Sequence, residues 1–212
     1  MRSLAAFVPG LCAPAAIAQA GLFSATGLDG WTEQTFEGKK PTGYRLIHES
    51  GAQVLQADCR ASASGWMRKQ KIDLERTPVV RWRWKVARVY SDVREREKKG
   101  DDFPARVYVV LGSGRALSRT RSLVYVWASA EPQGADWPSA YTKQAHVVAL
   151  RSGAADAGRW HEERRDVRAD FKRYFGIDVT AADGVAIMTD CDDAGGATRA
   201  WYGDVRFGAG KG

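Results

Sequence analysis

The sequence predicts an all-β protein, an antiparallel β-sandwich of the jelly-roll type with one short helix. Short segments rich in β-branched and aromatic residues recur along the 212-residue chain. Gly, Pro, Asp and Ser separate these segments, and several of them alternate apolar with polar side chains. Apolar residues make up 44% of the chain, which suffices for one domain with a full core.

Alternation and turn residues locate the individual strands. A sandwich or barrel is the usual architecture for many short strands separated in this way. In chain order, the expected strands are residues 31–36, 44–49, 53–58, 65–72, 79–88, 105–111, 122–129, 145–151, 160–167, 184–190 and 198–207.

One helix is expected, at residues 168–175. Phe171 and Phe175 repeat at the helical spacing of four residues, Asp166 is a candidate N-cap, and Gly176 is a stop signal. The apolar stripe predicts that this helix plugs one end or edge of the sandwich.

Residues 1–20 have the pattern of a secretory signal peptide. They carry one positive charge and no acid, then a short apolar stretch, then the small-x-small sequence Ala18-Gln19-Ala20. We therefore expect residues 21–212 to form a single domain that is periplasmic or secreted; a disordered cytoplasmic N-terminus is the alternative. No later segment reaches the roughly 20 apolar residues of a spanning helix, so no transmembrane segment is expected.

The net charge of +7 suits an anionic partner and equally suits solubility alone. Nucleic-acid binding is not expected from the segment VVRWRWKVAR, in which Arg and Trp interleave. Alternation places Trp82 and Trp84 on one face of the strand, and Arg81, Arg83 and Lys85 on the other. A stacking platform needs aromatic and cationic side chains on the same surface, so the tryptophans are expected in the core. The oligomeric state does not follow from the sequence.

The same alternation predicts a polar, aromatic face on three other strands. Where their valines or tryptophans face the core, the residues between them face outward. Sugars bind such surfaces, because their apolar ring faces stack on aromatic rings and their hydroxyls meet charged groups. The alternative is an ordinary half-exposed sheet, polar for cross-strand pairing alone. The predicted ligand-binding residues are Arg106, Tyr108, Tyr125, Trp127, Tyr202, Asp204 and Arg206.

The segment GDDFPARVYVV sets two acids and an arginine at the start of a buried strand. Asp102 and Arg106 lie four residues apart, about 13 Å along a straight strand at ~3.3 Å per residue, which is too far for an ion pair. We therefore expect Arg106 to pair with Asp204 on a neighbouring strand. Asp101 and Asp102 are expected to close the charged loop at residues 93–100.

A second acidic cluster follows an apolar strand in GVAIMTDCDDAGG. Carboxylates at this density can bind calcium, but the helical calcium-loop pattern fails, because Ala194 and Trp201 stand where oxygen ligands are required. Asp190 and Asp192 are therefore candidate ligands for a calcium site of another geometry. An acidic turn is the alternative.

Cys59 and Cys191 are the cysteines of the expected mature chain. An even pair in an exported protein predicts a disulfide. Each also lies near the end of an apolar strand, and burial as a free thiol is the alternative.

Several segments resemble DUF3047, an uncharacterised bacterial family. They are GDDFPARVYVV, SLVYVWAS, VVALRSG, DFKRYFG and GVAIMTDCDDAGGATRAWYGDVRF. The resemblance covers most of residues 21–212 and implies an exported β-sandwich protein without supplying an activity. The family pattern AIMTDTDNT differs here at Cys191, Asp193 and Ala194, so the disulfide is not implied as a family feature, and a calcium ligand at position 194 is not supported.

A non-catalytic domain that binds a small polar or glycan ligand is the first expectation, without a cofactor other than the candidate calcium. The alternatives are a carbohydrate-active hydrolase or lyase with paired aspartates, and a structural envelope protein. His48, His146 and His161 are isolated, and Ser113 lacks the Gly-x-Ser-x-Gly elbow of serine hydrolases. Two convergent carboxylates in a deep cleft would favour an enzyme, whereas a shallow aromatic face would favour binding.

Overall fold

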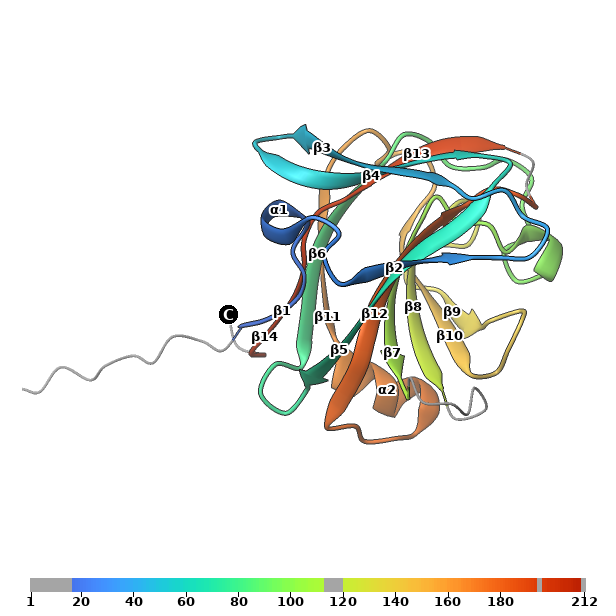
Figure 1. The fold of residues 1–212 in the computed structure, drawn as a ribbon. Helices are drawn as coiled ribbons and strands as arrows, with labels where there is room; N and C mark the ends of the chain where they lie inside the picture. Colours follow the sequence, from blue (N-terminus) through green and yellow to red (C-terminus); the bar gives the residue numbers. More distant parts are fainter. Residues whose placement is uncertain (1–16, 113–119, 194–195, 211–212) are drawn as a thin grey trace, which may run out of the picture.

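The computed structural model describes residues 17–112, 120–193 and 196–210, which form a β-sandwich of two seven-stranded sheets (Figure 1). The predicted fold class is confirmed, and each expected strand has a counterpart. Three sequence features lie outside the described residues: the signal peptide up to residue 16, Ser113 and Ala194.

The first sheet, sheet A, contains strands from both ends of the chain. Its spatial order is β1 (Ile17–Gly21), β14 (Val205–Gly208), β6 (Val79–Val86), β13 (Ala197–Tyr202), β4 (Ala52–Arg60) and β3 (Gly43–Glu49), and β11 (His161–Asp166) also pairs with β6.

The second sheet, sheet B, carries the two acidic segments singled out in the sequence. Its order is β2 (Trp31–Thr35), β5 (Ala63–Asp73), β12 (Ala181–Asp190), β7 (Ala105–Leu111), β8 (Arg121–Ala128), β10 (Ala145–Ser152) and β9 (Asp136–Pro138). Neighbouring strands run antiparallel throughout the described sheets except β8 and β10, which are parallel. Because β7 and β12 are adjacent, the ends of both acidic segments meet at one place.

Large aromatic side chains fill the space between the sheets. Trp82 and Trp84 of β6 are buried there, as predicted, and meet Tyr125 and Trp127 of β8 from sheet B. The rings of Trp82 and Tyr125 stack with centroids 5.4 Å apart, and those of Trp84 and Trp127 lie 6.2 Å apart. These contacts fix which side of β6 and of β8 faces the core.

The predicted helix is α2 (Val167–Phe175), which lies at one end of the sandwich (Figure 1). Asp166 caps it by accepting a hydrogen bond from the Ala169 amide at 3.0 Å, and Gly176 ends it in the left-handed conformation at φ 69°. Phe171 is fully buried in the core. The other helices described are short, α1 (Phe23–Thr26) and the 3₁₀ turn η1 (Lys98–Gly100). None of the helices described has the length and apolarity to cross a membrane.

The expected strand at 198–207 is divided into β13 and β14. The break falls at Gly203, where a Cβ atom would lie 2.5 Å from Arg83 Cγ, so the close approach requires glycine. The sequence did not predict β1 or β9, which are short strands at sheet edges. Cleavage after Ala20 would remove most of β1, and this cleavage stays a prediction.

Candidate functional site

The seven residues predicted to share one exposed face do not share it. Tyr125 and Trp127 of β8 and Tyr202 of β13 are fully buried between the sheets. Asp204 and Arg206 belong to sheet A, whereas Arg106 and Tyr108 lie on β7 of sheet B. The prediction of a common groove is therefore wrong.

The prediction of a common face failed because some of the strands, such as β8, are apolar on both faces. On β8, Val124 and Val126 face away from the main core, under a second apolar cluster that includes Phe103 and Trp137. The larger rings of the strand take the side between the sheets, where they bury more apolar area. The polar tip of Tyr125 is satisfied there, because its hydroxyl donates to Asp170 at 2.7 Å.

The tip of Tyr202 is satisfied in the same way, with its hydroxyl donating to the carbonyl of Met188 at 2.6 Å. Asp204 does not pair with Arg106, as the sequence predicted. It accepts hydrogen bonds from the Ser24 amide at 2.9 Å and hydroxyl at 2.5 Å, and it forms an ion pair with Arg206 at 2.5 Å. Asp204 and Arg206 thus belong to the outer face of sheet A.

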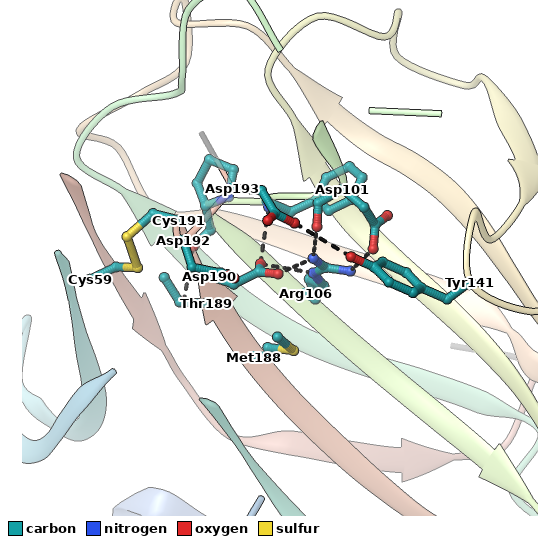
Figure 2. A network of polar contacts seen from close by, with 12 residues as sticks. Cys59, Asp101, Arg106, Tyr141, Met188, Thr189, Asp190, Cys191, Asp192 and Asp193 are labelled. Carbon is teal, nitrogen blue, oxygen red and sulfur yellow. Dashed lines mark hydrogen bonds and ion pairs between the residues drawn. A yellow bond between two sulfur atoms is a disulfide. The ribbon is translucent and has the colours of Figure 1, made fainter. Parts of the chain in front are cut away.

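Arg106 instead forms a buried network with acids from both acidic segments (Figure 2). Its Nε donates to Asp190 Oδ1 at 3.0 Å, its Nη2 pairs with Asp190 Oδ2, and its Nη1 pairs with Asp101 Oδ2 at 3.2 Å. The Asp190 carboxylate also accepts from the Phe103 amide at 3.0 Å. The guanidinium lies over the Phe103 ring, 4.5 Å from its centroid.

This network explains the two acids before the buried strand. Asp101 reaches back to Arg106 because η1 and the following residues turn the chain instead of extending β7. Gly100 permits that turn, since a Cβ there would lie 2.6 Å from the Arg94 carbonyl oxygen. Asp190 ends β12 on the same side as Met188, which is the cross-strand partner of Arg106. The pairing joins residues 84 positions apart, which no local pattern reveals.

Two carboxyl groups, from Asp101 and Asp190, are buried against this single guanidinium, and the buried carboxyl group of Asp102 acts on that of Asp190. Arg106 is 5% exposed, and Asp101, Asp102 and Asp190 are buried too. Burial raises the pKa of Asp190 to about 7, the Arg106 charge opposes the rise, and the Asp102 carboxylate adds to it. Burial alone would lower the pKa of Arg106, but the neighbouring carboxylates hold it well above its ordinary value. The network therefore keeps its guanidinium charged, and Asp190 takes up a proton at a higher pH than an exposed aspartate does.

The network forms the floor of a groove of about 480 Å³ on the outer face of sheet B, which we call the sheet B groove. Tyr108 and Met188 continue this floor, with the Tyr108 hydroxyl 3.7 Å from the Met188 sulfur. Phe36 and Tyr141 are 44% and 56% exposed and stand at its edge. The other residues that line it are Glu37, Lys39, Ala63, Val124, Ser139, Thr142, Ala145, Val147, Asp192 and Asp193.

Tyr141 also lines the groove, although the strand pattern of the sequence does not predict it. Its hydroxyl donates to the Lys98 carbonyl at 3.1 Å and lies 3.4 Å from Asp193 Oδ2, so the ring leans over the network (Figure 2). It lies in the loop between β9 and β10, outside the strands to which alternation applies. The signal available was an aromatic residue in a polar turn, SAYTKQ, where burial does not explain it.

The candidate calcium ligands are separated by the network. Asp190 is bonded to Arg106 and the Phe103 amide, while Asp192 pairs with Lys39. Ligand atoms of Asp102, Asp192 and Asp193 do lie within 4.8 Å of one another. Lys39 lies against this group and is also 3.5 Å from Asp193, so an ammonium already balances part of its charge. Calcium binding stays a prediction.

A disulfide stands directly behind the acidic turn (Figure 2). The structure joins Cys59 of β4 to Cys191, which follows Asp190, so the bridge ties sheet A to the end of β12. The Tyr90 hydroxyl donates to the Asp190 carbonyl at 2.6 Å on the same side. The disulfide at Cys191 and the hydrogen bond from Tyr90 thus both hold the backbone of Asp190 in place.

Residues 29–206 match the family described as "Protein of unknown function (DUF3047)", and the chain belongs to that family. No curated protein matches the chain.

Among solved structures, similar folds include the family 11 carbohydrate-binding module from Clostridium thermocellum in complex with a β-1,3-1,4-mixed-linked tetrasaccharide. It is 8% identical, with a TM-score of 0.49, over 91% of this chain and 96% of the other. The endoglucanase 3 of Trichoderma harzianum, from family GH12, is 8% identical, with a TM-score of 0.46, over 93% and 98%. Because both TM-scores are below 0.5, we infer neither a ligand nor an activity from them.

Proposed function

We propose that this protein is an exported, non-catalytic binding protein that holds a polar, saccharide-like ligand in the sheet B groove. The observation that carries the proposal is the exposed ring of Tyr141 beside the more accessible carboxyl groups of Asp192 and Asp193, above a rigid floor built on Arg106. Sugars present apolar ring faces to aromatic side chains and hydroxyls to charged hydrogen-bonding groups. A groove of about 480 Å³ falls within the usual range for small-molecule sites.

The charges that line the groove favour a neutral or cationic ligand. Five carboxyl groups, from Glu37, Asp101, Asp190, Asp192 and Asp193, face one arginine and one lysine. An anionic ligand would meet like charge there, which disfavours binding. A neutral glycan or an amino sugar meets no such penalty.

The floor is already ordered without a ligand. Asp190 and Arg106 hold each other in place, and the disulfide at Cys191 anchors the adjoining turn. A preformed site loses less conformational entropy on binding. This rigidity supports recognition of one ligand class.

An enzyme that acts on glycans is the second candidate, and one observation favours it. Burial raises the pKa of Asp190 to about 7, as a general acid requires. However, Asp190 is 3% exposed and both of its carboxylate oxygens are bonded to Arg106. A general acid must come within hydrogen-bond reach of its substrate, so we rank binding first.

The test is calorimetric titration of the purified protein with chitohexaose, cellohexaose and amino-sugar oligomers. Loss of one stacked ring removes about 0.5 to 1.5 kcal/mol beyond its buried area, so Tyr141→Ala should weaken binding at least several-fold. Trp201→Ala is the control, because Trp201 is a half-buried aromatic residue on the opposite sheet. Equal weakening by both variants, or no binding of any probe, would contradict the proposal. Release of reducing ends from a bound probe would favour the enzyme.

A further inference from the structure

A second cavity, of about 540 Å³, lies on the outer face of sheet A, across the sandwich from the sheet B groove. Its lining contains arginines from three different strands: Arg81 of β6, Arg164 of β11 and Arg206 of β14. We call these three residues the arginine row. It involves none of the residues of the sheet B groove and is independent of the function proposed for that groove.

The strand register sets the three arginines side by side. Arg81 is the Cα partner of Arg206 on β14 and also of Arg164 on β11, so β6 lies between the other two strands. Arg81 and Arg206 point away from the core, because their strand neighbours Trp82 and Phe207 are buried in it. Arg164 is exposed. At about 4.8 Å between strands, the row is roughly 10 Å long.

Like charges directly opposite one another destabilise a sheet, so such a row calls for counter-charge. Arg206 is paired with Asp204, and Arg164 donates to the Gly210 carbonyl. Within the described residues, the side chain of Arg81 makes no ion pair or hydrogen bond. The central guanidinium of the row therefore faces the cavity without a carboxylate.

The other charges that line the cavity leave it positive. Arg83 adds a fourth guanidinium, held over the Trp160 ring at 4.6 Å. Of the acids, Glu163 turns inward, where it accepts from Trp84 Nε1 at 3.1 Å, and Glu162 is exposed opposite Arg83. Asp204 shares its carboxylate between Arg206 and Ser24. The lining thus holds three acids and four arginines, and one of the acids, Glu163, is already bonded to Trp84 and Arg151.

We propose that the arginine row binds a ligand that carries two or more oxyanion groups and lies across β14, β6 and β11. Guanidinium groups bind carboxylate, sulfate and phosphate through paired hydrogen bonds. A row of roughly 10 Å matches an extended ligand with several such groups better than one small ion. The ligand supplies the charge that Arg81 lacks.

The experiment is calorimetric titration at low ionic strength with three probes: inorganic tripolyphosphate, trigalacturonate and a heparin tetrasaccharide. Each presents several oxyanions, as phosphate, carboxylate or sulfate. Arg81→Gln removes the central guanidinium, and Arg45→Gln removes an exposed arginine on β3 of the same sheet, with the same change in net charge. Because a hydrogen bond to a charged group is worth more than a neutral one, Arg81→Gln should weaken binding about tenfold or more, and Arg45→Gln less than about twofold.

Thermal unfolding separates binding from misfolding. Without a probe, Arg81→Gln should unfold at the same temperature as the wild type or higher, because it removes repulsion within the row. With the probe, the wild type should gain melting temperature and Arg81→Gln should gain much less. The probe that binds tightest identifies the oxyanion class. Equal weakening by the two variants would show that net charge alone attracts the probes and would overturn the proposal, as would failure of all three to bind.

Discussion

Replacing Arg106 by methionine should destabilise the protein strongly, because it leaves Asp101 and Asp190 buried without the cation with which both of them pair. Removing one partner of a buried ion pair costs about 3 to 5 kcal/mol, since an uncompensated charge remains. Two ion pairs and the contact with the Phe103 ring are lost together. We therefore expect a loss of about 3 to 5 kcal/mol in the free energy of unfolding at pH 8.

Urea unfolding, followed by tryptophan fluorescence, measures this loss. Arg45→Met is the control at an exposed arginine, and it should change the free energy of unfolding by less than about 0.5 kcal/mol. Lowering the pH should reduce the cost of Arg106→Met, because protonation removes the buried charge. Replacing Asp190 by leucine in the same variant should restore part of the stability. A loss below about 1 kcal/mol with an unchanged m-value, or a loss independent of pH, would refute the account of the network.

Three further predictions concern the same fold. The pKa of Asp190 is raised to about 7 in the folded protein, against about 3.9 in the unfolded chain, so the folded state binds more protons between these two pH values. The free energy of unfolding should therefore fall as the pH rises through that window, by up to about 1.4 kcal/mol per pH unit. Asp190→Asn should flatten this slope in urea titrations at several pH values. The double variant Cys59→Ala/Cys191→Ala should lose about 4 to 5 kcal/mol, because the bridge closes a loop of 132 residues, and a thiol titration of the denatured, unreduced mature protein should find neither cysteine free. N-terminal sequencing should show that the exported protein begins near Gly21, and recovery of residues 2–20 in the purified protein would contradict the signal peptide.

Much of the fold could be predicted because local signals suffice for it. The alternating residues of β6 turn Trp82 inward, and Asp166 and Gly176 mark the ends of α2. Both patterns depend on residues close together in the sequence. Short edge strands such as β1 and β9 lack such a pattern, since they are defined by the strand they pair with.

The candidate site could be predicted only in part, because it depends on distant pairing. Arg106 was identified as a site residue, but its partner on β12 is set by the order of strands in sheet B. Alternation also cannot orient β8, where Val124 and Tyr125 are both apolar enough for a core. The burial of Tyr125 depends on the rings of the opposite sheet, which the sequence does not place.

The most direct test of ligand binding in the sheet B groove is nuclear magnetic resonance of the labelled protein titrated with chitohexaose and with the amino-sugar oligomers. Binding in that groove should shift the signals of Tyr141, Met188 and residues 190–193, while those of Arg81 and Trp201 on sheet A stay unchanged. Shifts confined to sheet A, or no shifts at saturating concentrations of every oligomer, would contradict it.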